Sequence, residues 1–293
     1  MTTLITGGSG FIGSNLDGDI KASRADADLT QLDETLDYFA DVKPSVVIHA
    51  AAKHGNYAQM RENRVEYYRD NILINVNVFE AAKRVGVKNL LAFSSVTAFP
   101  DNLTSFNEAD LYSGAPHDSA YAYAYSKRMI DVLARAYRDD YKLNYNCVFL
   151  ANAYGPFGKE NVVPLLIKRC MNAIQNNVPF EVDGDGNNMR DLVFVRDLRK
   201  ITKRLVELPP FGSLIVSSGS IVSIRELVNE IVTALEYKDE VVWFPERDTG
   251  QKKKIPSNDR LKQLLPNSTF TNLQVGIQKT VEWHVLAQNC SVY

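Results

Sequence analysis

Cysteine is scarce in this chain of 293 residues, which contains only Cys147, Cys170 and Cys290. The three lie far apart and are odd in number, so they match neither a disulfide framework nor the close spacing of metal ligands. The sequence therefore predicts no structural metal and a reducing compartment. We expect a cytoplasmic protein.

An excess of charge of one sign is also missing. Lysine and arginine number 33 against 35 aspartates and glutamates, which gives a net charge of −2. A chain so close to neutrality lacks the basic surplus of proteins that mainly bind nucleic acid. No apolar run approaches the roughly 20 residues that span a bilayer, and residues 1–20 do not resemble a signal peptide. We expect neither a nucleic-acid partner nor a membrane partner.

Glycine is concentrated near the start of the chain. Residues 3–6 form a short apolar run, which predicts a strand, and lead directly into the loop Gly7-Gly8-Ser9-Gly10-Phe11-Ile12-Gly13. Glycines between a strand and a helix let backbone N–H groups approach a pyrophosphate closely. A glycine-rich turn without a ligand is the alternative, but the position after a strand favours a dinucleotide. We assign cofactor contacts to Gly7, Gly10, Phe11, Ile12 and Gly13.

The segment after this loop indicates which dinucleotide is bound. The predicted helix is cut short after Leu16, and the next strand is predicted over residues 19–23. An arginine at the end of that strand accommodates a ribose 2′-phosphate, whereas NAD sites carry an acidic residue there. Arg24 occupies this position and favours NADP(H), although a solvated arginine is the alternative. Asp28 and Leu29 are placed beside the adenine.

Three further apolar runs, residues 44–49, 90–94 and 145–150, predict buried parallel strands. Ligands of an open α/β sheet bind in the crevice outside the carboxyl ends of its strands. The residues that follow the first and second of these strands are therefore candidates for cofactor and substrate contacts: Ala50, Ala51, Ala52 and Lys53 for the cofactor, Ser95 and Thr97 for the substrate. Asn71, in a predicted helix over residues 65–85, is expected to be buried near the cofactor.

Tyr123 and Lys127 lie four residues apart in a predicted helix over residues 121–140, so they share one helix face. An ammonium beside a phenol lowers the pKa of the phenol, which can then exchange a proton with an alkoxide. Taken alone, this spacing is also common in exposed pairs whose long side chains cover the surface. Its position after the glycine loop and Ser95 favours carbonyl–alcohol interconversion.

Taken together, the glycine loop, Ser95, the Tyr123/Lys127 pair and the Asn152–Pro156 segment resemble the extended short-chain dehydrogenase/reductases, the NAD-dependent epimerase/dehydratase family. The resemblance covers essentially the whole chain. It implies an α/β fold with a doubly wound parallel (Rossmann) sheet. It also implies an NADP(H)-binding domain, residues 1–155 joined by 191–217, and a smaller sugar-nucleotide-binding domain, residues 156–293.

Three segments, residues 95–100, 123–131 and 248–261, are similar to the GDP-L-fucose synthase group of that family. Members of this group epimerise GDP-4-keto-6-deoxy-mannose at C3 and C5 and then reduce C4 with NADPH. The resemblance therefore implies a GDP-linked sugar substrate. It also implies a homodimer that forms through the helices over residues 65–85 and 121–140.

The resemblance makes Ser95, Tyr123 and Lys127 a reduction triad. Tyr123 would protonate the C4 oxygen, Lys127 would tune that tyrosine and hold the nicotinamide ribose, and Ser95 would hydrogen-bond the reacting oxygen. A solvated charge is the alternative for each basic residue among the substrate contacts, and arginines at these positions suit a diphosphate. The substrate contacts that the resemblance implies are Thr97, Asn152, Asn161, Arg169, Arg190 and Lys254.

Three positions depart from the family pattern. Thr97 stands where the family places its epimerising cysteine, Asn161 where it places the partner histidine, and Asp183 where it places a tryptophan of the sugar-nucleotide site. Threonine and asparagine do not titrate near neutral pH, so they cannot exchange a proton next to a ketone. The sequence therefore predicts a sugar-nucleotide 4-ketoreductase that uses NADPH and lacks the usual groups for C3/C5 epimerisation.

Two alternatives remain open. The first is a complete GDP-L-fucose synthase in which a relocated acid/base replaces the missing pair. The second is a non-catalytic NADP(H)-binding sensor, which is disfavoured because binding alone does not require Tyr123. The candidates for a relocated acid/base are His54, His117, Lys159 and Glu160, and a hydrogen-bonded structural or surface histidine is the favoured alternative for His54 and His117.

Overall fold

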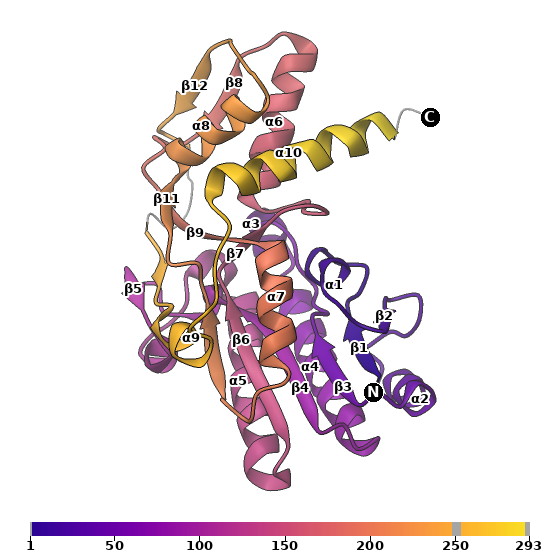
Figure 1. The fold of residues 1–293 in the computed structure, drawn as a ribbon. Helices are drawn as coiled ribbons and strands as arrows, with labels where there is room; N and C mark the ends of the chain where they lie inside the picture. The colour runs from indigo at the N-terminus through magenta and orange to yellow at the C-terminus, as the bar shows by residue number, and fades with distance from the viewer. Residues whose placement is uncertain (1, 248–252, 291–293) are drawn as a thin grey trace.

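The computed structural model describes residues 2–247 and 253–290. Its centre is a parallel sheet of six strands in the order β10-β6-β4-β3-β1-β2, drawn in the lower half of Figure 1. Each pair in this sheet is parallel, which confirms the predicted doubly wound sheet. The strands are β1 (Thr3–Thr6), β2 (Ile20–Ala22), β3 (Val46–His49), β4 (Asn89–Ser95), β6 (Asn144–Leu150) and β10 (Ser213–Val216).

The order of these strands reverses between β1 and β3. From β1 the chain crosses to β2 on one side, whereas from β3 it crosses to β4 on the other. Connections that leave two adjacent strands in opposite directions open a crevice at the carboxyl ends of those strands. The glycine loop follows β1 and the Ala50–Lys53 segment follows β3, so the fold brings both segments to this crevice.

Helices cover both faces of the sheet (Figure 1). α2 (Leu32–Val42), α4 (Arg64–Arg84) and α5 (Tyr121–Tyr141) pack together on one face, and α1 (Phe11–Asn15) and α7 (Val195–Leu205) on the other. α1 is as short as the sequence predicts. The apolar residues 192–195 predict a short strand, but Val195 already begins α7.

A second group of elements occupies the upper half of Figure 1. It has its own apolar core, which includes Ile167, Phe180 and Leu227. The spacing of Ser223 and Glu226 predicts a capping box, and the two residues form one at the start of α8 (Ile224–Ala234). The elements of this group are α6 (Val162–Asn176), β8 (Phe180–Asp183), α8 (Ile224–Ala234), β12 (Val241–Phe244) and α10 (Leu273–Cys290).

Short elements connect the two cores. β9 (Met189–Phe194) lies between β7 (Asn152–Tyr154) and β11 (Ile221–Ser223) in a three-stranded sheet. The buried Asp191 carboxylate accepts hydrogen bonds from Ser217 Oγ at 2.7 Å and from the Gly219 N–H at 3.0 Å, and so ties β9 to the loop after β10. The remaining elements are α3 (Tyr57–Glu62), η1 (Val96–Ala98), β5 (Ser105–Phe106), η2 (Glu108–Tyr112), η3 (Asp118–Ala120), β13 (Ile255–Pro256) and α9 (Asp259–Leu264).

The predicted division into two domains stays a proposal. The position of α9 does not agree with the predicted boundary. Residues 156–293 were assigned to the second domain, yet Leu261 and Leu265 pack into the core of the six-stranded sheet. Cys147 and Cys170 are buried free thiols. Across residues 2–247 and 253–290, no helix combines the length and the apolar character needed to cross a membrane.

Candidate active site

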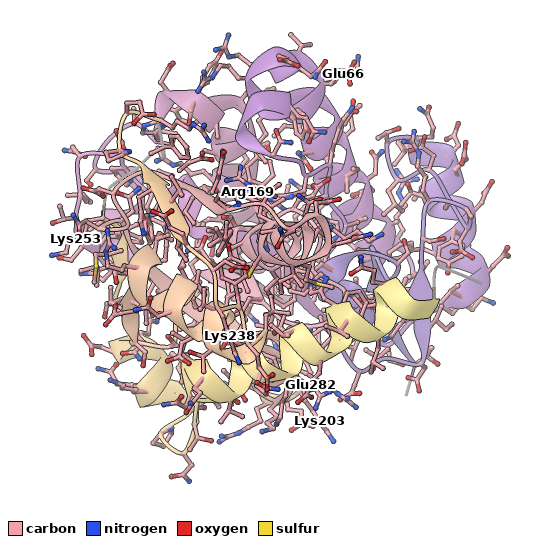
Figure 2. The ribbon with its side chains drawn as sticks, turned by 90° about the horizontal axis from the view of Figure 1, so that it is seen from above. Glu66, Arg169, Lys203, Lys238, Lys253 and Glu282 are labelled. Atoms are coloured by element: carbon pink, nitrogen blue, oxygen red, sulfur yellow. The ribbon has the colours of Figure 1, made fainter. Side chains whose placement is uncertain are left out.

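A cavity of about 830 Å³ is lined by residues from the carboxyl ends of the central strands and by residues of the second group. Figure 2, seen from above, shows Arg169 of α6 near the middle of the view, with Glu66 of α4 and Glu282 of α10 toward opposite sides. The cavity brings together fifteen predicted site residues: Gly7, Gly10, Phe11, Ile12, Gly13, Ala50, Ala52, Ser95, Thr97, Tyr123, Lys127, Asn152, Asn161, Arg169 and Arg190.

The glycine loop has the geometry that a dinucleotide requires. Gly7 has a φ of +71°, and a Cβ there would lie 2.7 Å from the Ala51 backbone. A Cβ at Gly13 would lie 2.3 Å from the carbonyl oxygen of Gly7. At Gly10, which lines the cavity, only that same oxygen lies within 4 Å of the Cβ position. The missing side chain therefore leaves the backbone open to a ligand, and the loop fits a dinucleotide diphosphate.

Tyr123 and Lys127 lie on the cavity side of α5, as their spacing predicts, and are 6% and 4% exposed. Lys127 Nζ donates a hydrogen bond to the carbonyl oxygen of Phe93 at 3.0 Å and lies 5.9 Å from the centroid of the Tyr123 ring. Burial lowers the pKa of Lys127 to about 8. The buried Ser94 hydroxyl donates to the Lys127 carbonyl oxygen and so aligns α5 with β4.

Ser95 lies at the end of β4, where the chain enters η1. Its hydroxyl oxygen accepts hydrogen bonds from the Thr97 N–H at 3.2 Å and from the Thr97 hydroxyl at 2.8 Å. With these two donors directed at its oxygen, the Ser95 proton is free to point toward a ligand in the cavity. Thr97 is therefore engaged with Ser95.

Asn71 is buried, as expected, and acts on the segment after β3. Its side chain accepts a hydrogen bond from the Lys53 N–H at 2.9 Å and donates one to the Lys53 carbonyl oxygen at 3.0 Å. Neither residue lines the cavity. The Lys53 ammonium is paired with Glu66 at 2.5 Å and with Asp70 at 3.0 Å, so any cofactor contact of this segment falls to its backbone and to the neighbouring alanines.

Arg24 and Asp28 form an ion pair at 3.0 Å just beyond β2. The Arg24 side chain is 85% exposed, and neither residue lines the cavity. Hydrogen bonds from Thr30 hold the pKa of Asp28 below its usual value, with a smaller contribution from Arg24. Leu29 and Ala51 also lie outside the cavity lining, and the Leu29 carbonyl oxygen accepts a hydrogen bond from the buried Asn77 at 3.0 Å.

Two of the predicted substrate-side residues, Arg169 and Asp183, are paired with each other. Arg169 lies 2.8 Å from Asp183, and Arg247 lies 3.1 Å from the other oxygen of the same carboxylate. Burial raises the pKa of Asp183, but hydrogen bonds from the two arginines outweigh it and hold the pKa below its usual value. Arg190 lines the cavity and donates to the Met189 carbonyl oxygen at 2.9 Å.

The remaining predicted substrate residues differ in their placement. Asn152 donates to the Asp191 carbonyl oxygen at 3.2 Å, and Asn161 donates to the Ala153 carbonyl oxygen at 3.0 Å. Both line the cavity, whereas Lys254 is buried outside the lining. Burial lowers the pKa of Lys254 to about 7. The neighbouring residues 248–252 lie outside the described part of the chain.

Two of the candidate acid/base residues meet in the cavity. The His54 ring packs edge-on against the Tyr123 ring, with centroids 5.6 Å apart, and its Nδ1 lies 3.8 Å from Glu160 Oε2. His117 and Lys159 also line the cavity, and His117 Nδ1 is hydrogen-bonded to the Ser119 hydroxyl at 2.7 Å. His117 is thus engaged in a local cap at η3.

Sequence reasoning missed several residues of the lining, among them Arg61, Phe157 and Asn188. Phe157 has a φ of +67° and packs against Trp283 of α10, with ring centroids 5.0 Å apart. The Gly155-Pro156 pair signals a turn at this point, but nothing in the local pattern indicates a contact with a helix near the end of the chain.

Comparison with known proteins places this site in context. Residues 3–213 match the model of the NAD dependent epimerase/dehydratase family. A GDP-L-fucose synthase of Dictyostelium discoideum is 34% identical over 97% of this chain and 95% of its own length. A probable GDP-L-fucose synthase of Drosophila melanogaster is 33% identical over 96% of both chains. The crystal structure of a GDP-L-fucose synthetase from Naegleria fowleri bound to NADP has a TM-score of 0.90 at 26% identity, and covers 98% of this chain and 94% of that chain.

Proposed function

The chain belongs to the NAD dependent epimerase/dehydratase family, and from this premise we propose that it is an NADP(H)-dependent reductase of a nucleotide-linked 4-keto-6-deoxy sugar. One observation carries the proposal: Ser95, Tyr123 and Lys127 line the same cavity as the glycine loop. GDP-4-keto-6-deoxy-mannose is the proposed substrate, because relatives of 33% and 34% identity are named GDP-L-fucose synthases.

The residues that would hold NADP(H) come from the ends of three strands. The loop of residues 7–13 would bind the diphosphate through its backbone. The exposed Arg24 side chain would leave its partner Asp28 and bind the 2′-phosphate, which is possible because ion pairs near the surface contribute at most about 1 kcal/mol. When bound, NADPH supplies the hydride. Asn71 would act indirectly, since it holds the backbone of Lys53.

The reduction follows from the positions of the triad. Ser95 would donate a hydrogen bond to the C4 oxygen, because Thr97 already donates to the Ser95 oxygen. Tyr123 would transfer its proton to the same oxygen as the C4 alkoxide forms. The Lys127 ammonium, held by the Phe93 carbonyl oxygen, would stabilise the resulting phenolate.

The sugar nucleotide would lie against the second group of elements. Arg169 and Arg190 would bind its diphosphate, since a guanidinium can donate to two phosphate oxygens at once. Arg169 would have to exchange Asp183 for the phosphate, and Arg247 would keep the Asp183 carboxylate paired. Asn152 and Asn161 offer side-chain amides to the sugar.

The proposal is tested by NADPH oxidation with the 4-keto-6-deoxy sugar linked to GDP, compared with the same sugar linked to UDP. We expect oxidation with the GDP-linked sugar and the C4 alcohol as product, identified by NMR. Failure to oxidise NADPH with either substrate would overturn the proposal. A preference for the UDP-linked sugar would overturn the assignment of the nucleotide alone.

We further propose that a second copy of the chain packs against α4 and α5. Both helices expose apolar side chains at one-turn spacing, which is the pattern of a helix–helix interface. On α5 they form a continuous stripe. A Met129→Lys variant should shift a dimer measured by light scattering to a monomer, and a wild-type monomer would contradict the interface. The exposed apolar residues are Val65, Tyr68, Leu73 and Val76 on α4, and Tyr121, Tyr125, Met129, Val132 and Tyr141 on α5.

A further inference from the structure

The two residues at the family's epimerisation positions are hydrogen-bonded to the protein itself. The Thr97 hydroxyl donates to Ser95 at 2.8 Å, and the Asn161 amide donates to the Ala153 carbonyl oxygen at 3.0 Å. Neither side chain titrates near neutral pH. If the carbon atoms beside the C4 ketone exchange protons in this cavity, another group must perform the exchange.

A pair of titratable residues, His54 and Glu160, lies next to Asn161 in the cavity lining. His54 comes from the segment after β3, and Glu160 from the segment between β7 and α6, directly before Asn161. Their Nδ1 and Oε2 atoms are 3.8 Å apart, and their side chains are 46% and 47% exposed. Both residues line the cavity, so the pair is accessible to a bound ligand.

The packing of His54 against Tyr123 places the pair beside the reacting atoms. The two rings meet edge-on with centroids 5.6 Å apart. In the proposed reduction, the C4 oxygen of the substrate binds at the Tyr123 phenol. C3 and C5 are each bonded to C4, so a base that packs against Tyr123 can reach a hydrogen on one of these carbons.

We propose that His54, paired with Glu160, exchanges the proton on a carbon next to the C4 ketone. This inference rests on the proposed function, because it requires a 4-keto sugar in the cavity. Neutral His54 removes the proton, and the electron pair of the C–H bond forms the enolate double bond. The negative charge then lies on the C4 oxygen, where Ser95 and Tyr123 donate hydrogen bonds. The imidazolium, stabilised by Glu160, returns a proton to the carbon, and no atom is oxidised or reduced.

The charges that surround His54 suit a base. Burial lowers the pKa of His54, and the Lys127 charge lowers it further, while Glu160 opposes both effects. A lowered pKa favours the neutral ring, which is the form that removes a proton. Once His54 is protonated, the Glu160 carboxylate lies 3.8 Å from Nδ1 and compensates the new charge.

The test is solvent exchange without reduction. The protein is incubated with GDP-4-keto-6-deoxy-mannose and NADP⁺ in D₂O, and deuterium at C3 and C5 is followed by NMR against a blank without enzyme. We expect exchange above the blank for the wild type, a loss of about 100-fold in His54→Gln, and a loss of about tenfold in Glu160→Gln. Absence of wild-type exchange would overturn the inference.

His117→Gln is the matched variant, because His117 is the other histidine that lines the cavity. If His117→Gln abolishes exchange and His54→Gln does not, the assignment is wrong. NADPH oxidation is measured on each variant as a second readout. Equal losses of oxidation and exchange in His54→Gln would indicate general damage to the site and would overturn the specific role. Wild-type oxidation without exchange would sink this inference and leave the proposed reductase intact, whereas absence of oxidation would sink the proposed function.

Discussion

Two neighbouring pairs of residues in the cavity differ in how they are held. Tyr123 and Lys127 are 6% and 4% exposed and lie on a helix that hydrogen bonds join to the neighbouring strand. His54, which packs against Tyr123, and Glu160 are 46% and 47% exposed and come from connecting segments. Groups fixed by sheet–helix packing tolerate little change, whereas those on loops can be exchanged for others. We therefore expect substitutions of Tyr123 and Lys127 to have larger effects than substitutions of His54 and Glu160.

The largest effect on NADPH oxidation is expected for a substitution of Tyr123. Tyr123→Phe removes the proton donor and leaves the ring packing in place. We expect NADPH oxidation to fall by about 10³-fold, within the range for loss of a general acid, while NADPH still binds, as measured by fluorescence titration. Oxidation at the wild-type rate in this variant would exclude Tyr123 as the acid. A sensor without catalysis would show no oxidation even in the wild type.

A pH profile tests the buried lysine. The pKa of Lys127 is lowered by burial to about 8, so the ammonium that supports Tyr123 is present below pH 8 and is lost above it. We expect kcat/KM for reduction to fall about tenfold per pH unit above pH 8. Lys127→Met should be slow at every pH and lack this limb. A wild-type rate that stays constant up to pH 10 would contradict the role of the ammonium.

A Thr97 variant tests whether the threonine at the family's cysteine position contributes to reduction. Thr97→Val keeps the shape of the side chain and removes the hydroxyl that donates to Ser95. We expect kcat for reduction to fall about fivefold to tenfold with little change in KM, because one hydrogen bond contributes about 1 kcal/mol. Thr97→Ser restores the hydroxyl and should restore kcat. If Thr97→Val behaves as the wild type, Thr97 does not orient Ser95.

The smallest effect is expected at Asp183. Asp183→Asn removes the carboxylate that pairs with Arg169 and frees this arginine for the diphosphate. Both side chains are partly exposed, so solvent weakens the ion pair, and we expect KM for the sugar nucleotide to fall only about twofold to fivefold. KM for NADPH should not change. A rise in KM for the sugar nucleotide would show that Asp183 itself binds the substrate.

Much of the fold could be predicted because its signals are local. Five of the six central strands appear as short apolar runs, the exception being β2 with Lys21 at its middle, and the lengths of α4 and α5 agree with their patterns to within two residues. α2 and α10 were not predicted. The end of β9 was misplaced because Phe194 and Val195 are both apolar, although one closes a strand and the other begins a helix.

The candidate site could be predicted in part for the same reason. The glycine loop and the Tyr123/Lys127 pair are local patterns whose geometry follows from a turn and from one helical repeat. Arg24 and Lys53 illustrate the limit, because their ion pairs with Asp28 and with Glu66 depend on where the neighbouring elements lie. Spacing along the chain carries no information on such pairings.

Three features of this chain can be predicted from its residues alone: a parallel doubly wound sheet, a glycine loop after the first strand, and a tyrosine–lysine pair on one helix face. These features follow from short-range patterns of apolar and small residues. Other features depend on how the chain packs: His54 meets Glu160 and Tyr123, Asp183 pairs with Arg169, and Phe157 packs against Trp283. Each of these contacts joins different elements or connecting segments, so it forms only when those elements pack in the folded chain.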